Sequence, residues 1–423
     1  MKTEIKTDTL VIGNSAAAIG AAQYFAKENA AEKMTVVSKE PYSSYSRPFI
    51  VYYAAGEIEK DRLFYKKEEY LTGLGITEIR DCVITELDVK NRVAISADNR
   101  RFHYSKLLLG SGSSALKPPI PGADKDNVVN FMTLSDAETI KKKAADIKSA
   151  VVIGGGLVGL KAVEALHLMG KKVTVIDIAD FLMARVLDKF SAELMQKKMG
   201  GAGIDIFTGT AVKAIYGEDK AAGVLLDNGK KIDADLVVVS VGVKPNLDFL
   251  PGYKSGFLSV NRQMKTEFDG IYGAGDIVSA YNPLSDTNEP NPVWPNAYKQ
   301  GLIAAANILG NDRTFAGSFQ QNVLEFADYP IISYGKVQKD DADTKELVNF
   351  DRKSNVYRKA VIKNGKLIGA VLAGNIERAG VYKGIMENGL DVSAFSDKLT
   401  DFDFGYQNLP ETYMREMFYK VSS

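Results

Sequence analysis

The chain has 423 residues, of which 45% are hydrophobic and 25% charged, and it is longer than one hydrophobic core usually organises. Lys+Arg and Asp+Glu are both 53, so no overall field would attract nucleic acid or an acidic membrane surface. No apolar run is long enough to span a bilayer, and the polar start MKTEIKTD lacks the layout of a signal peptide. We therefore expect two or three domains, a cytoplasmic location, no membrane span and no nucleic-acid partner.

Few residues could carry redox or metal chemistry. Cys82 is the only cysteine, which excludes an internal disulfide, a CxxC pair, a cysteine-ligated zinc site and an iron–sulfur cluster within the chain. His103 and His167 are the only histidines, so no metal site is expected. Redox chemistry would then need a bound organic cofactor, and Cys82 is expected to be a small buried core thiol.

One local pattern occurs twice in the first half of the chain: a strand, a turn of small residues, a helix and a second strand. The copies are TLVIGNSAAAIGAAQYFAKENAAEKMTVVSKE at 9–40 and AVVIGGGLVGLKAVEALHLMGKKVTVIDIAD at 150–180. Each is a βαβ unit, and together they predict a parallel sheet in each of two domains. Further strands are predicted at 106–109 and 236–241, and a helix at 297–310.

The sequence changes character after about residue 316, where the glycine turns stop. The run NVYRKAVIKNGKLIGAVLAG alternates as antiparallel strands do, with Asn364-Gly365 as a hairpin turn. We interpret 317–423 as a third domain of the α+β class.

The second glycine turn is a complete dinucleotide fingerprint, formed by Gly154, Gly156 and Gly159. The glycines permit the tight turn, the close approach of the backbone to a pyrophosphate and close packing of the helix on the strand. The helix that begins at Leu157 and Val158 would face the phosphates with its N-terminus. Asp177 ends the next strand, where an acid accepts from a ribose 2′-hydroxyl and repels a 2′-phosphate. NADH is favoured over NADPH, although Asp177 could instead cap the following segment.

The first glycine turn departs from the fingerprint, since Gly13 is followed by Ser15, Ala16, Ala17 and Ala18. Ser15 stands where the second glycine belongs, and Ala18 is a tolerated variant of the third.

The best candidate for the ribose-binding acid of this first unit is Glu40, and Lys39 before it is an unusual neighbour.

Five motifs occur in the order used by the FAD-dependent pyridine nucleotide-disulfide oxidoreductases, which the chain resembles. They are GNSAAA, YSRP at 45–48, LLLGSGSS at 107–114, GGGLVG, and GVKPN with TEFDGIYGAGD. Within that superfamily the chain looks most similar to a branch without a redox cysteine: the NADH:rubredoxin and ferredoxin reductases and the flavin domain of NADH-dependent nitrite reductase. The stretch YRKAVIKNGKLIGAVLAGNIERAG resembles the last domain of the same group.

The resemblance implies an α/β fold with two nested doubly wound, Rossmann-like domains and a C-terminal α+β domain. A discontinuous FAD-binding domain would comprise 1–115 and 247–316. The NAD(H)-binding domain would comprise 116–246, and 317–423 would follow as the third domain. FAD and NAD(H) would be the cofactors.

The resemblance also assigns residues to the two cofactors. Asp276 would hydrogen-bond the ribityl chain and bring the helix near Ala297 towards the flavin, whose negative charge the helix N-terminus would stabilise. Arg47 and Pro48 would line the site, and Trp294 would lie at the ring edge. The FAD residues are Gly13, Ser15, Ala16, Ala17, Glu40, Arg47, Pro48, Ser111, Gly112, Gly275, Asp276, Trp294 and Ala297. The NAD residues are Gly154, Gly156, Leu157, Val158, Gly159, Asp177 and Gly242.

Simpler interpretations exist for three of these residues. Asp276 could be a capping aspartate, Arg47 a surface arginine and Trp294 a core tryptophan.

Two departures from the family pattern bear on mechanism. Relatives that act through a cysteine carry it shortly after the second strand, where this chain has SSYSRPFIVYYAAG and no cysteine. Relatives also pair a glutamate after the last fingerprint glycine with a lysine after YSRP. Here Lys161 replaces the glutamate and Tyr52 stands at about the position of the lysine. We hypothesise that Lys161 stabilises negative charge on the reduced flavin; a lysine that reaches solvent from an ordinary helix is the alternative.

The expected function is an FAD-dependent NADH:acceptor oxidoreductase. Hydride would pass between NAD(H) and flavin, and electrons would be exchanged with a separate small iron–sulfur protein of the ferredoxin or rubredoxin type, in either direction. A homodimer is compatible with this function. The enzymatic alternatives are an NADH oxidase and a quinone or dye reductase, and a non-catalytic flavoprotein scaffold or redox sensor is an alternative of another class.

Overall fold

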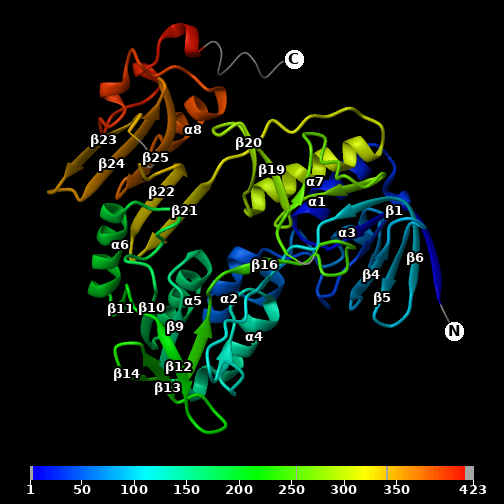
Figure 1. The fold of residues 1–423 in the computed structure, drawn as a ribbon, viewed down its shortest axis with the longest axis horizontal. Coiled ribbons are helices and arrows are strands. Elements are labelled where there is room, and N and C mark those ends of the chain that lie inside the picture. Colours follow the sequence, from blue (N-terminus) through cyan, green and yellow to red (C-terminus); the bar gives the residue numbers. More distant parts are fainter. Residues whose placement is uncertain (1–2, 254, 340–341, 415–423) are drawn as a thin grey trace. The chain divides into compact units, whose positions relative to one another are not determined.

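The computed structural model describes residues 3–253, 255–339 and 342–414 (Figure 1). The chain forms two compact units. The first unit comprises Met1–Leu116, Met132–Lys141 and Gly242–Ser318, and the second comprises Lys117–Phe131, Lys142–Val241 and Phe319–Ser423. Residues 415–423 of the expected third domain lie outside the described residues.

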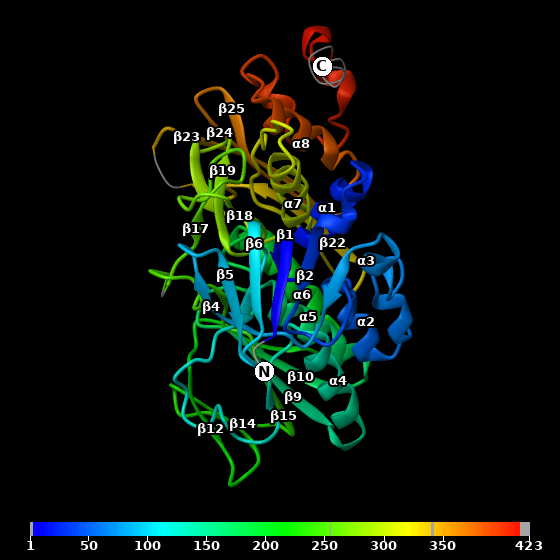
Figure 2. The same cartoon turned by 90° about the vertical axis from the view of Figure 1, so that its right-hand side faces the viewer.

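The first unit is built on a seven-stranded sheet in the order β3-β2-β1-β6-β5-β4, with β18 also paired to β6 (Figure 2). The strands are β1 (Glu4–Ile12), β2 (Met34–Val37), β3 (Thr77–Ile79), β4 (Ile84–Asp88), β5 (Val93–Ser96), β6 (Arg101–Leu109) and β18 (Ile271–Gly273). β1, β2, β3, β6 and β18 are parallel, whereas β4 and β5 form an antiparallel extension. The two strands of the first expected βαβ unit, β1 and β2, therefore lie inside the sheet, and their apolar residues are buried on both faces.

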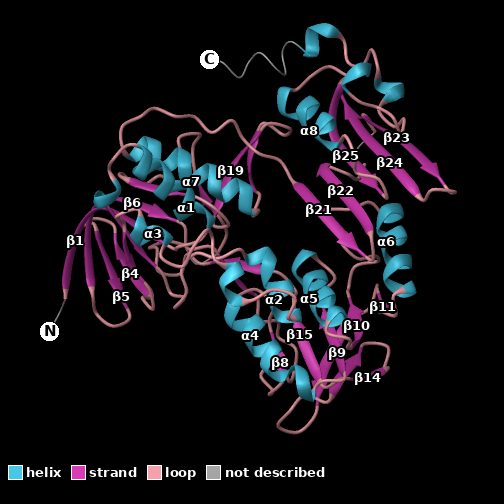
Figure 3. Cartoon of the chain, turned by 180° about the vertical axis from the view of Figure 1, so that it is seen from behind, coloured by secondary structure: helices cyan, strands magenta, loops and turns pink. Residues whose placement is uncertain are grey.

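Two helices of the first unit pack closely because small residues lie between them. These are α1 (Ala16–Lys27) and α7 (Trp294–Ile308), which lie side by side in Figures 1 and 3. A Cβ atom on Gly301 of α7 would lie 2.0 Å from the carbonyl oxygen of Ala17, and one on Gly20 would lie 2.1 Å from that of Tyr298. Glycine at both positions lets the two backbones touch.

Two small sheets complete the first unit. The strands are β7 (Ser113–Ala115) with β16 (Val243–Pro245), and β17 (Leu258–Ser259) with β19 (Val278–Asn282) and β20 (Thr287–Pro290). The β7–β16 pair joins the end of LLLGSGSS to GVKPN, two motifs that are far apart in the sequence.

The second unit contains a parallel sheet in the order β11-β10-β9-β15-β8. Its strands are β8 (Val128–Val129), β9 (Ser149–Ile153), β10 (Lys172–Ile176), β11 (Asp205–Phe207) and β15 (Leu236–Val239). An antiparallel side sheet is formed by β12 (Val212–Tyr216), β13 (Gly223–Leu226) and β14 (Lys231–Asp233). The second βαβ unit therefore builds a doubly wound sheet of its own.

The C-terminal part of the second unit is a five-stranded antiparallel sheet in the order β21-β22-β25-β24-β23 (Figure 3). Its strands are β21 (Gln321–Phe326), β22 (Tyr329–Gly335), β23 (Thr344–Asp351), β24 (Val356–Lys363) and β25 (Lys366–Ala373). The expected Asn364-Gly365 hairpin is confirmed: it joins β24 to β25, and both residues have positive φ, 51° and 73°. The predicted α/β fold with a C-terminal α+β domain is thus confirmed.

A buried polar cluster joins this sheet to the helix α6 (Lys189–Gly201). Asp188, the N-cap of α6, accepts a hydrogen bond of 2.8 Å from the hydroxyl of Tyr357. Lys359, whose side chain is 7% exposed, lies 3.5 Å from Asp188 and 2.8 Å from Glu346. The buried ammonium group of Lys359 therefore lies against two carboxylates and is not left unpaired.

Five further helices complete the described parts of the two units. They are α2 (Ile50–Ala55), α3 (Tyr70–Gly73), α4 (Leu134–Lys143), α5 (Leu157–Leu168) and α8 (Ala379–Asn388), with 3₁₀ turns at Ala31–Lys33, Arg47–Phe49, Lys60–Leu63, Ala144–Asp146, Ser396–Lys398 and Tyr406–Asn408. Among them, α5 packs against β9, β10 and β15, and α8 packs against β25. Over the residues that the structure describes, no helix has the length and apolar character needed to cross a membrane.

The α1–α7 contact predicts a stability difference between two helical glycines. Gly301→Ala should lower the midpoint of thermal unfolding, because the added methyl forces the helices apart at a cost of about 1–3 kcal/mol. Gly200→Ala in α6 is the control: nothing lies within 4 Å of the added Cβ, and alanine favours a helix by roughly 0.5–1 kcal/mol. Equal midpoints for the two variants would contradict the close contact.

Candidate dinucleotide-binding sites

The glycine turn of the second unit connects β9 to α5 and fits a pyrophosphate. A Cβ atom on Gly154, whose φ is +105°, would lie 2.1 Å from the carbonyl oxygen of Ser240, and one on Gly159 would lie 1.9 Å from that of Gly154. At Gly156, by contrast, no protein atom lies within 4 Å of an added Cβ. Gly154 and Gly159 are therefore required by close packing within the protein, whereas Gly156 leaves open space over the turn.

The N-terminus of α5 has free backbone donors. Gly156 is its N-cap and makes no side-chain cap, so the N–H groups of the first turn, which begins at Leu157 and Val158, have no side-chain acceptor there. Such a helix end favours an anion. The carboxylate of Asp177 lies over the same turn, because it accepts hydrogen bonds from the N–H groups of Gly155 and Ala179.

The glycine turn of the first unit repeats this backbone geometry. Gly13 has φ +107°, and a Cβ atom there would lie 2.1 Å from the carbonyl oxygen of Gly110. Ser15 is the N-cap of α1 and makes no side-chain cap, so the N-terminus at Ala16 and Ala17 also keeps its donors. The serine in place of the second glycine therefore leaves the helix end available.

The same backbone hydrogen bond occurs in both turns, and it shows which residues of the two turns correspond. The N–H of Gly13 donates to the carbonyl of Val37, and the N–H of Gly154 donates to that of Ile176, both at 2.8 Å. Val37 thus corresponds to Ile176, and the counterpart of Asp177 is Ser38. Glu40, the expected ribose-binding acid, lies two residues further along.

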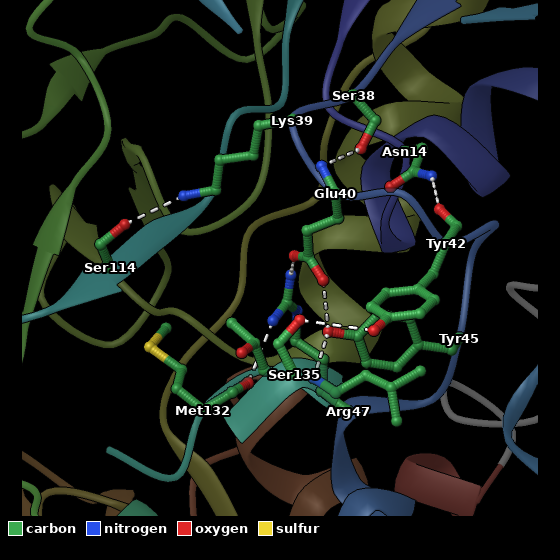
Figure 4. A network of polar contacts seen from close by, with 12 residues as sticks. Asn14, Ser38, Lys39, Glu40, Tyr42, Tyr45, Arg47, Ser114, Met132 and Ser135 are labelled. Atoms are coloured by element: carbon green, nitrogen blue, oxygen red, sulfur yellow. Dashed lines mark hydrogen bonds and ion pairs between the residues drawn. The ribbon is translucent and has the colours of Figure 1, made fainter. Parts of the chain in front are cut away.

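Glu40 is engaged elsewhere in the first unit (Figure 4). Its Oε1 accepts from Nη2 of Arg47 at 2.6 Å, and its Oε2 accepts from the hydroxyl of Tyr45 at 2.7 Å. Nη1 of Arg47 donates to the carbonyl of Met132 at 3.0 Å. Burial raises the pKa of Tyr45, which keeps this hydroxyl a donor. Arg47 is therefore not a free surface arginine: Glu40 holds it in place, and Pro48 follows in the same 3₁₀ turn.

The GAGD turn packs on α7 through a residue that the sequence analysis missed. The N–H of Gly275 donates to Oε1 of Gln300 at 2.8 Å, and Gln300 is only 3% exposed. Gly275 has φ +83°, and an added Cβ would lie 3.4 Å from the Cβ of Ala297. Asp276 then accepts a hydrogen bond of 2.8 Å from the hydroxyl of Ser113.

Ser111 and Gly112 are held by the GVKPN motif. The hydroxyl of Ser111 donates to the carbonyl of Asn246 at 2.7 Å, and the side-chain amide of Asn246 donates back to Ser111 at 3.0 Å. Gly242 begins the GVKPN motif, and its carbonyl accepts a hydrogen bond from the N–H of Leu116. Gly242 belongs to the first compact unit.

Trp294 is the first residue of α7 and is partly buried among aromatic rings. Its ring is stacked on Tyr298 with centroids 5.8 Å apart and an interplanar angle of 7°, and it lies 5.8 Å from the ring of Tyr65. The N-cap of α7, Val293, makes no side-chain cap, but this helix end has few free donors, because Pro295 has no N–H and the N–H of Asn296 already donates to the carbonyl of Val293.

Lys161 has a partner that the sequence analysis missed. Its Nζ lies 2.6 Å from Oε2 of Glu164, one turn later in α5. The family's charge pair between two segments is therefore replaced by a pair within one helix. Tyr52, at about the position of the family lysine, is partly buried and packs edge-on against Phe49. An i,i+3 search from Lys161 would have found the glutamate.

The described residues place no thiol at either turn. Cys82 is 2% exposed within the apolar core of the first unit, and burial raises the pKa of its thiol. In the described part of the chain, no group of three or more His, Cys, Asp or Glu side chains could hold a metal ion.

Two glycine turns against parallel sheets, each followed by an uncapped helix, are typical of a dinucleotide-binding protein of the α/β class. Residues 7–301 match the pyridine nucleotide-disulphide oxidoreductase family, and residues 321–390 match the rubredoxin NAD+ reductase C-terminal domain. The chain belongs to the pyridine nucleotide-disulphide oxidoreductase family, which confirms the resemblance. It is an NAD(P)H-dependent flavin oxidoreductase related to the rubredoxin reductases, and its family uses FAD and NAD(P)H.

Curated relatives are similar along most of the chain. The NADH-dependent phenylglyoxylate dehydrogenase subunit epsilon of Aromatoleum evansii is 30% identical over 370 residues, which is 86% of this chain and 87% of the relative. The rubredoxin-NAD(+) reductase of Ectopseudomonas oleovorans is 29% identical over 306 residues, 71% of this chain and 80% of the relative. The NAD(P)H nitrite reductase of Bacillus subtilis is 27% identical over 92% of this chain, which spans only 48% of that relative.

Solved structures share the fold. A NAD-dependent persulfide reductase from A. fulgidus superposes with a TM-score of 0.85 at 26% identity, over 95% of this chain and 80% of the other. A ferredoxin reductase from Rhodopseudomonas palustris superposes with a TM-score of 0.84 at 23% identity, over 94% of this chain and 98% of the other. The second likeness establishes the fold alone.

Asp177 and Ile178 predict the nucleotide preference. Ile178 is 77% exposed directly after the acid, so a longer side chain there meets no packing restraint. Asp177→Asn with Ile178→Arg should lower the ratio of kcat/KM for NADH to that for NADPH by about tenfold or more, because repulsion of the 2′-phosphate becomes attraction. Ile178→Gln, which adds length without charge, should leave the ratio unchanged. An unaltered ratio in the double variant would refute the assignment of Asp177.

Cys82 predicts an inert thiol. Cys82→Ala should retain the wild-type rate of NADH oxidation with a dye acceptor, because the side chain lies in the core rather than at a turn. The native protein should also resist alkylation by iodoacetamide until it unfolds. Rapid alkylation that abolishes turnover, followed by loss of activity in the variant, would assign the thiol a redox role.

Proposed function

We propose that the chain oxidises NADH at the second glycine turn, reduces FAD held by the first unit, and exchanges electrons with a separate small iron–sulfur protein. FAD would be bound by 1–115 and 247–316, and NADH by 116–246. Bound FAD would accept a hydride and release electrons one at a time. The protein's own residues would bind and orient the cofactors, so no general acid or base is required.

One observation supports this proposal above the others: two glycine turns, built alike, each leave an uncapped helix N-terminus. Gly13 and Gly154 both touch a neighbouring carbonyl at a distance only glycine permits. A scaffold or sensor that binds flavin alone has no use for the second turn with Asp177 in place. Catalysis is therefore favoured over the non-catalytic alternative.

The nature of the acceptor is supported by chemistry and by the relatives' names. The described residues include no second thiol and no metal cluster, so the chain's own side chains offer no onward carrier. Relatives are named as rubredoxin-NAD(+) reductases, and one solved relative is a complex of putidaredoxin reductase with putidaredoxin. We extend this kind of partner to the present chain, together with a cytoplasmic location.

A direct NADH oxidase is the second candidate. It is supported by a relative named NADH oxidase from Enterococcus faecalis, 30% identical over 82% of this chain. The chain lacks a cysteine in the stretch after the second strand, where relatives that reduce oxygen through a thiol carry one. Electron transfer to a protein carrier is therefore the preferred proposal.

Comparison of acceptors tests the choice. The holoenzyme is mixed with NADH and either air-saturated buffer, a quinone, a ferredoxin or a rubredoxin, and NADH consumption is followed. We expect turnover to be faster with one of the iron–sulfur proteins than with oxygen or the quinone. Full-rate turnover on oxygen, with no acceleration by either carrier, would reverse the assignment.

The Lys161–Glu164 pair predicts a shift in flavin potential. If Lys161 stabilises negative charge on the reduced flavin, Lys161→Ala should lower the two-electron potential by about 30 mV, equivalent to about 1.4 kcal/mol. Glu164→Gln should shift it the opposite way, since it removes the anion. Lys172→Ala, at a lysine 73% exposed in the same unit, is the control. An unchanged potential and hydride-transfer rate in Lys161→Ala would leave it an ordinary surface lysine.

A further inference from the structure

The loop that connects β10 to α6, residues 178–188, folds back onto the second glycine turn. The N–H of Met183 donates to the carbonyl of Gly155 at 3.0 Å, and a Cβ atom on Gly155 would lie only 2.3 Å from Cδ2 of Leu182. Leu182 and Met183 are 0% and 2% exposed. Met183 has a φ of +60°, a conformation that persists in a side chain of this kind only where the surrounding structure holds it.

The loop and Asp177 hold the same residue of the turn. Asp177 accepts a hydrogen bond from the N–H of Gly155, and Met183 donates to the carbonyl of Gly155. Both backbone polar groups of Gly155 are therefore bonded by the segment that follows β10. An acid at the end of this strand binds the adenosine ribose of a dinucleotide, so the loop lies at the adenosine side of the proposed NADH site.

The C-terminal sheet, β21 to β25, holds the other end of the loop. Nε2 of Gln338, which follows β22, donates to the carbonyls of Ala184 at 2.7 Å and Leu187 at 3.2 Å. The hydroxyl of Tyr357 in β24 donates to the carboxylate of Asp188 at 2.8 Å. Three acceptors of the loop are thus bonded by side chains that come 151 to 169 positions later in the sequence.

The other contacts of the loop fix its shape more than its place. The N–H groups of Val186 and Leu187 both donate to the carbonyl of Met183, which closes a local turn. The N–H of Leu182 donates to Oε1 of Gln196 in α6 at 2.9 Å. Asp188 is the N-cap of α6, so the bond from Tyr357 holds the loop and this helix together.

We propose that Gln338 and Tyr357 are positioning residues of the NADH site. They hold loop 178–188 against Gly155, so that the turn and Asp177 are set for the adenosine half of NADH before it binds. Both act through the loop and not through contact with the nucleotide. Without them, binding of NADH would have to order the loop, and this cost lowers affinity. This inference rests on the proposal that the second turn binds NADH.

The test compares NADH with reduced nicotinamide mononucleotide, which lacks the adenosine half. Each is mixed without oxygen with the full-length FAD-bound protein, and the rate of flavin bleaching is followed against concentration. The double variant Gln338→Ala with Tyr357→Phe should raise the Kd for NADH by about tenfold and leave the limiting rate unchanged, because neutral hydrogen bonds that order the adenosine side are lost. Its bleaching rate per unit concentration of the mononucleotide should equal that of the wild type.

Tyr329→Phe is the matched control. Tyr329 is a buried tyrosine of β22 in the same sheet, and its hydroxyl donates to the carbonyl of Asn355 at 2.9 Å. The control loses a comparable bond that does not reach the loop, so its Kd for NADH should equal that of the wild type.

Three results would overturn the inference: an unchanged Kd for NADH in the double variant, a parallel loss with the mononucleotide, or an equal loss of NADH affinity in Tyr329→Phe. The last two would show that the contacts support the structure in general. A wild-type flavin that NADH does not reduce would overturn the proposed function, and this inference with it.

Discussion

In both compact units, the glycine that ends the first strand of a βαβ unit lies directly against a backbone carbonyl of a neighbouring segment. Gly13 meets Gly110 and Gly154 meets Ser240, each at a distance where a Cβ atom would be 2.1 Å from the carbonyl oxygen. Any other residue would push the turn away from the sheet. Because the turns stay close, the helices that follow begin directly above the sheet with uncapped N-termini, and the remaining site residues are arranged around those ends.

Residues around the turns hold them in place through hydrogen bonds. Gln300 holds the GAGD turn on α7, Ser113 holds Asp276, and Asn246 joins Ser111 to the distant GVKPN motif. In the second unit, Asp177 bonds the turn itself. These contacts bring together motifs that are up to 163 residues apart in the sequence, and they leave the space over Gly156 open.

Much of this architecture is predictable from the sequence because it depends on local pattern. The two βαβ units, the position of α7 and the Asn364-Gly365 hairpin follow from apolar periodicity and turn chemistry. The direction of charged side chains does not follow from these patterns. Glu40 has the expected spacing from the first turn. However, the loop after β2 folds back so that Arg47 and Tyr45 both hydrogen-bond to its carboxylate. The pairing of Tyr357 with Asp188 requires the packing of α6 on the C-terminal sheet, which no local motif encodes.

We propose that the second turn admits NADH, which then reduces flavin bound elsewhere in the same chain. The most direct measurement is the loss of visible flavin absorbance when NADH is added without oxygen to the FAD-bound protein and to a Gly156→Val variant. Because no protein atom lies within 4 Å of a Cβ at Gly156, the variant should fold and retain FAD. We expect rapid bleaching of the wild-type flavin and little bleaching of the variant at the same NADH concentration. Equal bleaching of both proteins, or none in the wild type, would contradict it.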